Sequence, residues 1–302
     1  IRDVIRVDMR VVRLALHVYQ WFVPVQNLQS AYDALVDLLR RETDYRHEAA
    51  CMQRMAQNFG GQDDVLIPEP IDSLTTMDVL TMTFMEGIKI TEIGNEELTG
   101  ISKKAVAKRL TQCSYEQIFV HRFFHADPHP GNFLVQRGDT PDKPRLVILD
   151  FGAISEVSPE MVDGMIEVLQ GFFEKKDELV LQGVARIGFM AEGGNRELLE
   201  KTVITYFRKL LKIEDRTPGA LMRAKAEELE RLADPEVERR ELRGLMKSVH
   251  YPDGWFYVER ASVLLFWLVG QIDPDVDTLK VGFPYILPLL MKKTAAAKRA
   301  SP

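Results

Sequence analysis

The amino-acid sequence predicts an α+β fold of two lobes, a smaller lobe of long helices with short strands and a larger, mostly helical lobe. Apolar residues recur at helical spacing near the N-terminus and again from Pro159 onward, whereas the middle of the chain holds short strand-like runs between turns. We expect residues 1–85 to form the smaller lobe and residues 86–302 to form the helical lobe.

The individual elements follow from the same spacing. We expect helices at 1–23 and 28–59, with Pro24 between them and Gly60-Gly61 after them. Short strands are predicted at 65–67 and 79–84, and a helix with Ser102 as its N-cap at 102–122. A turn rich in Gly, Asp and Pro joins predicted strands at 133–135 and 146–149. From Pro159 the period is helical, with breaks near 193–194, 218–219, 252–254 and 273–274.

The composition is that of a globular protein. The chain has 302 residues, of which 46% are hydrophobic and 28% charged, and a formal net charge of −6. Disorder is excluded, and a mildly acidic chain has no overall attraction for nucleic acid. Cys51 and Cys113 form no CxxC pair, so we expect no cysteine zinc site and a cytoplasmic location. The most apolar stretches, 262–270 and 283–291, are too short to span a bilayer.

The segment from His125 to Gly152 contains the residues that phosphoryl transfer needs. Asp127 is followed five residues later by Asn132, and a short predicted hairpin then ends in Asp150-Phe151-Gly152. This order and spacing are those of a kinase catalytic loop and metal-binding triplet. Asp127 would face the acceptor hydroxyl or water, while Asn132 and Asp150 would each offer an oxygen to Mg²⁺ beside the phosphates of ATP.

Two other interpretations of this segment stay open. Its polar residues could be turn residues that only cap local backbone. His121, His125 and His129, together with Asp127, also have a spacing that suits zinc or iron, so a metal-dependent hydrolase is a rival hypothesis. The rival leaves the asparagine and the Asp-Phe-Gly triplet without a role. We therefore prefer to read His125 as a residue that packs beneath the loop and bonds its backbone.

Upstream, an acidic run lies within the second predicted helix. Asp44 and Glu48 are four residues apart and share a helix face, whereas Glu42 points elsewhere. Acidic residues on a helix are most often solvated, but a kinase fold requires a helical carboxylate that holds the phosphate-binding lysine.

Together these segments resemble the UbiB (AarF-like) atypical kinase family. The resemblance is carried by the run E-T-D-Y-R-H-E-A at 42–49, by D-P-H-P-G-N at 127–132 and by L-D-F-G-A at 149–153, and it extends over nearly the whole chain. It implies a protein-kinase-like fold with ATP in the cleft between two lobes. It also implies that Asp150 binds the metal, that Asn132 assists it and that Asp127 occupies the catalytic-loop position.

The same resemblance assigns roles outside the loop. It implies that Glu48 pairs with a strand lysine and that Glu42 and Asp44 meet a family-specific N-terminal helical extension. The backbone of Met85, Glu86 and Gly87 would receive adenine. The chain contains neither a V-A-x-K lysine strand nor a KxGQ motif. The family order places both before residue 1, so we expect an incomplete N-lobe and weak activity of this chain alone.

Members of this family are associated with ubiquinone and other isoprenoid-lipid metabolism and act at membranes, so a membrane surface or an isoprenoid lipid is an expected partner. Trp255, Phe256, Phe266 and Trp267 could form an interfacial face, although core packing is the alternative for them. ATP hydrolysis is better supported for the family than protein phosphorylation. Two further alternatives are a small-molecule phosphotransferase of the aminoglycoside-kinase type and a nucleotide-binding scaffold that does not catalyse transfer.

Overall fold

The structure is a computed structural model, and it describes residues 9, 11–14, 32, 36, 44–94, 96–190, 195–211, 217–220 and 249–300. Of the first predicted helix the structure describes only residues 9 and 11–14, which are helical, and most of the second predicted helix lies outside the described residues. The described part of the second is α3, Tyr45–Asn58. Asp44 has extended backbone angles, φ −121° and ψ 97°, and its side chain accepts a hydrogen bond from the Arg46 N–H. Asp44 is thus the N-cap of α3, and the prediction of one unbroken helix through this residue is wrong.

A four-stranded sheet lies beside α3. Its order is β1 (Val65–Leu66), β5 (Arg145–Ile148), β4 (Phe133–Gln136) and β2 (Ile88–Lys89). β1 runs parallel to β5, and the other two pairs are antiparallel. The β4–β5 pair is the predicted hairpin, with Phe133 opposite Ile148, so that the end of β5 brings Asp150 close to Asn132.

One expectation about strands was wrong, and one small sheet was not predicted. The predicted strand at 79–84 forms only an isolated bridge between Met82 and Pro70, and Phe84 is 88% exposed. Within the described chain no strand pairs with the whole of this segment, so its hydrogen bonding does not extend beyond the one bridge. A second, two-stranded sheet of β3 (Phe123–His125) and β6 (Ile154–Glu156) was not predicted, because three-residue strands show too little periodicity to be recognised.

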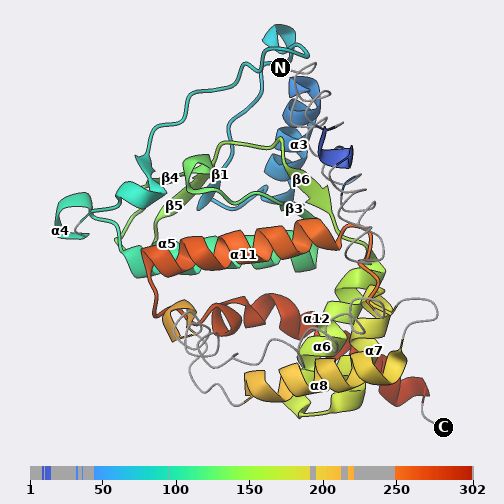
Figure 1. The fold of residues 1–302 in the computed structure, drawn as a ribbon. Helices are drawn as coiled ribbons and strands as arrows, with labels where there is room; N and C mark the ends of the chain where they lie inside the picture. The colour runs from blue at the N-terminus through green and yellow to red at the C-terminus, as the bar shows by residue number, and fades with distance from the viewer. Residues whose placement is uncertain are drawn as a thin grey trace.

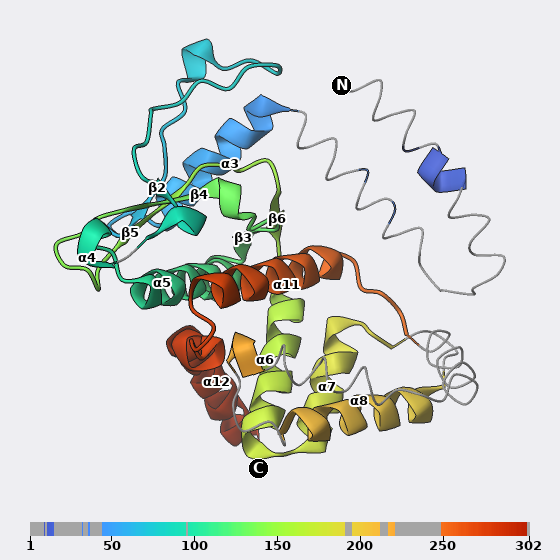
Figure 2. The same ribbon diagram turned by 60° about the vertical axis from the view of Figure 1, so that its left-hand side comes forward.

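The helices form the other part of the molecule. α5 (Lys103–Tyr115) begins at the predicted N-cap Ser102 and continues as a π-helical turn, η3 (Glu116–His121). Figures 1 and 2 both show α11 (Trp255–Ile272) lying along α5, between the sheet and the lower helices. Those lower helices are α6 (Pro159–Glu174), α7 (Asp177–Ile187), α8 (Arg196–Leu211) and α12 (Thr278–Ala300). No helix among the described residues is long and apolar enough to cross a membrane.

Two apolar clusters hold these layers together. One joins α3, the sheet, α5 and α11, and includes Met52, Leu146 and Leu268. The other joins η3, β3 and the lower helices, and includes Phe124, Ile166 and Ile286. The first cluster contains residues from both sides of position 85, so the two predicted lobes share apolar core, and the boundary between them stays a prediction.

α6 and α7 approach each other at three glycines, Gly164 and Gly171 of α6 and Gly183 of α7. A Cβ atom on Gly183 would lie 2.5 Å from the carbonyl oxygen of Gly164 and 2.7 Å from a methyl of Val168. Real Cβ atoms do not approach backbone so closely, so the crossing requires glycine. The absence of side chains at these three positions is therefore what allows the two helices to pack at this distance.

Gly183→Ala should lower the free energy of unfolding by about 1–3 kcal/mol, because one helix must shift to admit the methyl group. Denaturant unfolding would measure the change. Gly94→Ala is the matched control, since the nearest atom to a Cβ there is 3.8 Å away. Equal stability of the two variants would contradict the close crossing.

Candidate active site

The residues singled out in the sequence line one cavity of about 780 Å³. Glu48, Asp127, Asn132 and Asp150 all contribute to its wall, as does Asp78, which was not predicted. The remaining lining residues are Tyr45, Val79, Leu80, Met82, Leu149, Gly152 and Ala153. We call this space the acidic cavity. Four carboxylates line it, and the described lining residues include no lysine, arginine or histidine. Such a set of like charges favours a bound cation.

The loop at 125–132 is closed by its own hydrogen bonds. The Asn132 side-chain N–H donates to the Asp127 carbonyl at 3.2 Å, which ties the two ends of the loop together. His129 accepts a hydrogen bond from the Gly131 N–H at 3.1 Å and caps the short helix η4, Pro130–Asn132. Since its amide nitrogen is used inside the loop, Asn132 can offer its side-chain oxygen to a ligand.

The Asp-Phe-Gly triplet is held at two points. Asp150 accepts a hydrogen bond from the Gly152 N–H at 2.9 Å, which fixes the turn after β5. Phe151 is fully buried in the apolar cluster, and its N–H donates to Glu48 Oε1 at 3.2 Å. The Glu48 side chain therefore joins α3 to the triplet across the wall of the acidic cavity.

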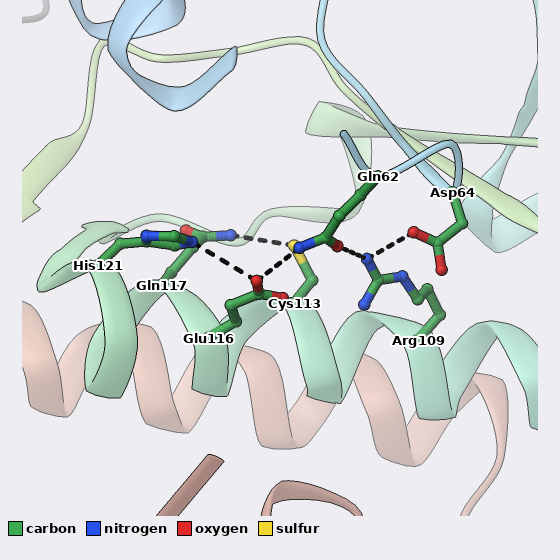
Figure 3. A network of polar contacts seen from close by, with 7 residues as sticks. All are labelled: Gln62, Asp64, Arg109, Cys113, Glu116, Gln117 and His121. Carbon is green, nitrogen blue, oxygen red and sulfur yellow. Dashed lines mark hydrogen bonds and ion pairs between the residues drawn. The ribbon is translucent and has the colours of Figure 1, made fainter. Parts of the chain in front are cut away.

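A polar network anchors the other end of α3 (Figure 3). Arg109 Nη2 donates to Gln62 at 2.6 Å and to Asp64 at 2.8 Å, both in the segment that follows α3. Gln62 in turn donates to Glu116 at 2.6 Å. Both ends of α3 are thus fixed, one to the Asp-Phe-Gly triplet and one to α5 and η3.

The same network reaches the start of the catalytic loop. Gln117 accepts a hydrogen bond from the His125 backbone N–H at 2.8 Å and donates to Cys113 Sγ at 3.2 Å. Burial raises the pKa of the Cys113 thiol to about 12, so the sulfur stays protonated and takes no part in nucleophilic chemistry.

The rival histidine metal site does not assemble. His121 lies against Phe59, with ring centroids 5.4 Å apart, and 3.5 Å from Glu116, whereas His129 caps η4. His125 is buried behind the loop, and burial lowers its pKa although Asp150 and Asp127 oppose the shift, which favours a neutral imidazole. No group of three or more His, Cys, Asp or Glu residues in the described part of the chain could hold a metal ion.

The other assigned residues lie apart from the acidic cavity or outside the description. Glu42 is outside the described residues, and Asp44 caps α3. Met85, Glu86 and Gly87 are not among the described residues that line the cavity. The Glu86 carbonyl accepts a hydrogen bond from the Gln136 side chain at 2.6 Å, so this segment lies against β4.

One residue at the site was given no role there from the sequence. Arg260 of α11 lies 3.1 Å from Asp127 Oδ2. No local pattern signals this pair, because its two members are brought together only by the packing of α11.

The chain is similar to proteins of a known kinase-like family. A family model described as an ABC1 atypical kinase-like domain matches residues 1–184. The chain is 28% identical over 321 residues to the protein ACTIVITY OF BC1 COMPLEX KINASE 8, chloroplastic, of Arabidopsis thaliana, covering 99% of this chain and 42% of that protein. It is 31% identical over 207 residues to a probable protein kinase UbiB of Aliivibrio fischeri, covering 66% of this chain and 37% of that protein.

A solved structure shows the same fold. It is the complex of Rv3197 with erythromycin from Mycobacterium tuberculosis, with a TM-score of 0.56 and 20% sequence identity, covering 91% of this chain and 67% of that one. The chain spans less than half the length of the curated relatives that it matches.

Glu48→Ala should lower the free energy of unfolding by about 1–3 kcal/mol, because the buried Phe151 N–H loses its acceptor. Glu48→Gln keeps an oxygen at that position and should cost less. Amide hydrogen exchange at Phe151 would be measured together with denaturant unfolding. Glu92→Ala, which removes a surface pair with Lys89, is the control. Unchanged exchange at Phe151 in Glu48→Ala would show that the contact does not exist.

Proposed function

The chain belongs to the ABC1 atypical kinase-like family, and on this premise we propose that the protein to which it belongs is an ATP- and Mg²⁺-dependent atypical kinase or ATPase. The observation that carries the proposal is the convergence of Asp127, Asn132 and Asp150 on the acidic cavity. A loop supplies the first two of these residues, the segment after β5 supplies the third, and α3 adds Glu48. Phosphoryl transfer requires residues of these kinds in one cleft.

The residues present fit a magnesium ion. Mg²⁺ is commonly held by one or two protein oxygens together with the phosphates of its nucleotide, so Asn132 and Asp150 suffice as protein ligands. Four carboxylates line the acidic cavity and Arg260 pairs with one of them, so the cavity keeps an excess of negative charge that a cation would offset. When bound, the ion would neutralise charge on the phosphates.

The protein's own groups then have separate tasks. Asp127 would orient the acceptor hydroxyl or water and receive its proton. Glu48 holds the triplet through Phe151 N–H, and a carboxylate fixed in this way is also suited to the lysine partner that the family resemblance assigns to it. Adenine recognition by the backbone of Met85–Gly87 is part of the same proposal. It is supported by Met82, three residues earlier, which lines the acidic cavity.

Full-length protein should hydrolyse ATP with Mg²⁺, and Asp150→Asn should abolish this turnover, because an amide gives the metal a weaker, uncharged ligand. Phosphate release would be measured beside the ATP-induced shift in melting temperature. Asp139→Asn, in the exposed turn between β4 and β5, is the control and should behave as wild type. Normal turnover by Asp150→Asn would remove Asp150 from the mechanism. Binding of ATP without any hydrolysis by the wild type would favour a scaffold.

We further propose that this activity serves isoprenoid-lipid metabolism at a membrane surface. An apolar cavity of about 360 Å³ between α5, α6 and α11 supports the proposal, because it could receive an apolar group. Trp255 and Phe266 line this cavity, whereas Trp267 is 45% exposed and available to an interface.

Full-length protein should therefore float with liposomes, and Trp267→Ser should weaken this binding at least about threefold, since it removes exposed aromatic area. Leu98→Ser, which removes an exposed apolar residue on α4 (Glu96–Thr99), is the control. Recovery of the wild-type protein wholly in the soluble fraction would contradict the membrane role.

A further inference from the structure

The ion pair between Arg260 and Asp127 connects α11 to the loop at the acidic cavity. The Arg260 guanidinium lies 3.1 Å from Asp127 Oδ2, and the two side chains are 29% and 27% exposed. Arg260 is not among the described residues that line the cavity, so it contacts the aspartate from behind. It also lies outside residues 1–184, the segment that the family model matches.

Apolar packing places this arginine. Val258 and Ala261 of α11 are buried in the same cluster as Phe124 and Ala126, which lead into the loop. Ala261 follows Arg260 in the sequence, and Ala126 precedes Asp127. Because both neighbours are buried in this one cluster, the charged residues beside them lie close to each other. The helix α11 fixes the backbone of Arg260, and β3, which ends two residues before Asp127, fixes the start of the loop that carries the aspartate.

Stability alone is a weak reason for such a pair. An ion pair that is more than a quarter exposed on both sides contributes little to the free energy of folding. The pair instead fixes the orientation of the Asp127 carboxylate, because a guanidinium presents its donors in a rigid plane. With Oδ2 turned toward Arg260, the other carboxylate oxygen of Asp127 is left for the acidic cavity that Asp127 lines.

The residue that precedes Asp127 differs from the one found in ordinary protein kinases. In ordinary protein kinases an arginine precedes the catalytic-loop aspartate, in the pattern His-Arg-Asp. Here the residue before Asp127 is Ala126, which is fully buried. The positive charge that lies beside Asp127 in this structure belongs to Arg260 of α11.

We propose that Arg260 is a positioning residue that holds the Asp127 carboxylate in the orientation needed to receive the acceptor. This inference rests on the proposed ATP-dependent activity, in which Asp127 contacts the acceptor. It assigns a role in turnover to α11, which the catalytic-loop motif and the Asp-Phe-Gly triplet do not include.

Turnover of ATP by full-length wild type, Arg260→Gln, Asp127→Asn and the double variant tests the proposal. Arg260→Gln should lower kcat by about 10- to 100-fold, the loss expected from a misplaced reacting group, while the KM for ATP stays nearly constant. Arg260→Lys should recover part of the loss, because it restores the charge without the rigid plane. In the Asp127→Asn background, Arg260→Gln should cause no further loss, since its effect passes through the Asp127 carboxylate.

Arg186→Gln is the matched control. It removes another arginine–carboxylate pair between helices, to Glu167 at 2.9 Å, away from the acidic cavity, and kcat should be unchanged. An active wild type with unaltered kcat in Arg260→Gln, or fully additive losses in the double variant, would overturn the role of Arg260. A wild type without any turnover would instead overturn the proposed function itself, so the two failures are distinguishable.

Discussion

The hydrogen bond from the Phe151 N–H to the Glu48 carboxylate connects the two parts of the site. It joins a helix near the N-terminus to the triplet that follows β5, and both partners are buried. The network around Arg109 fixes the opposite end of the same helix to α5. Because α3 is bonded near both ends, its position beside the acidic cavity is fixed relative to the Asp-Phe-Gly triplet and to α5.

Much of this arrangement follows from local chemistry. The β4–β5 hairpin, the Ser102 cap and the helices after Pro159 were predicted because each depends on residues close together in the chain. The order Asp127, Asn132, Asp150 led to the expectation of a shared cavity, and the structure places all three in the wall of one.

The remaining features depend on contacts distant in sequence. The pairing of β3 with β6 is visible only when two three-residue segments meet, and the segment at 79–84 has strand-like residues but little to pair with in the described chain. Asp44 was placed inside a helix because the sequence around it has a helical period, although its side chain caps the helix instead. Arg260 resembles any polar residue on an amphipathic helix until α11 is packed against the loop.

The burial of Phe151 has a consequence for inhibitor design. Turning this ring out of the core, as some kinase inhibitors require, would forfeit about 1.5–3 kcal/mol of apolar burial and would also separate its amide from Glu48. A compound aimed at this protein should therefore fit the triplet with the Phe151 ring inside the core. Chemical libraries selected for binding to kinases whose phenylalanine has left the core are a poor starting point.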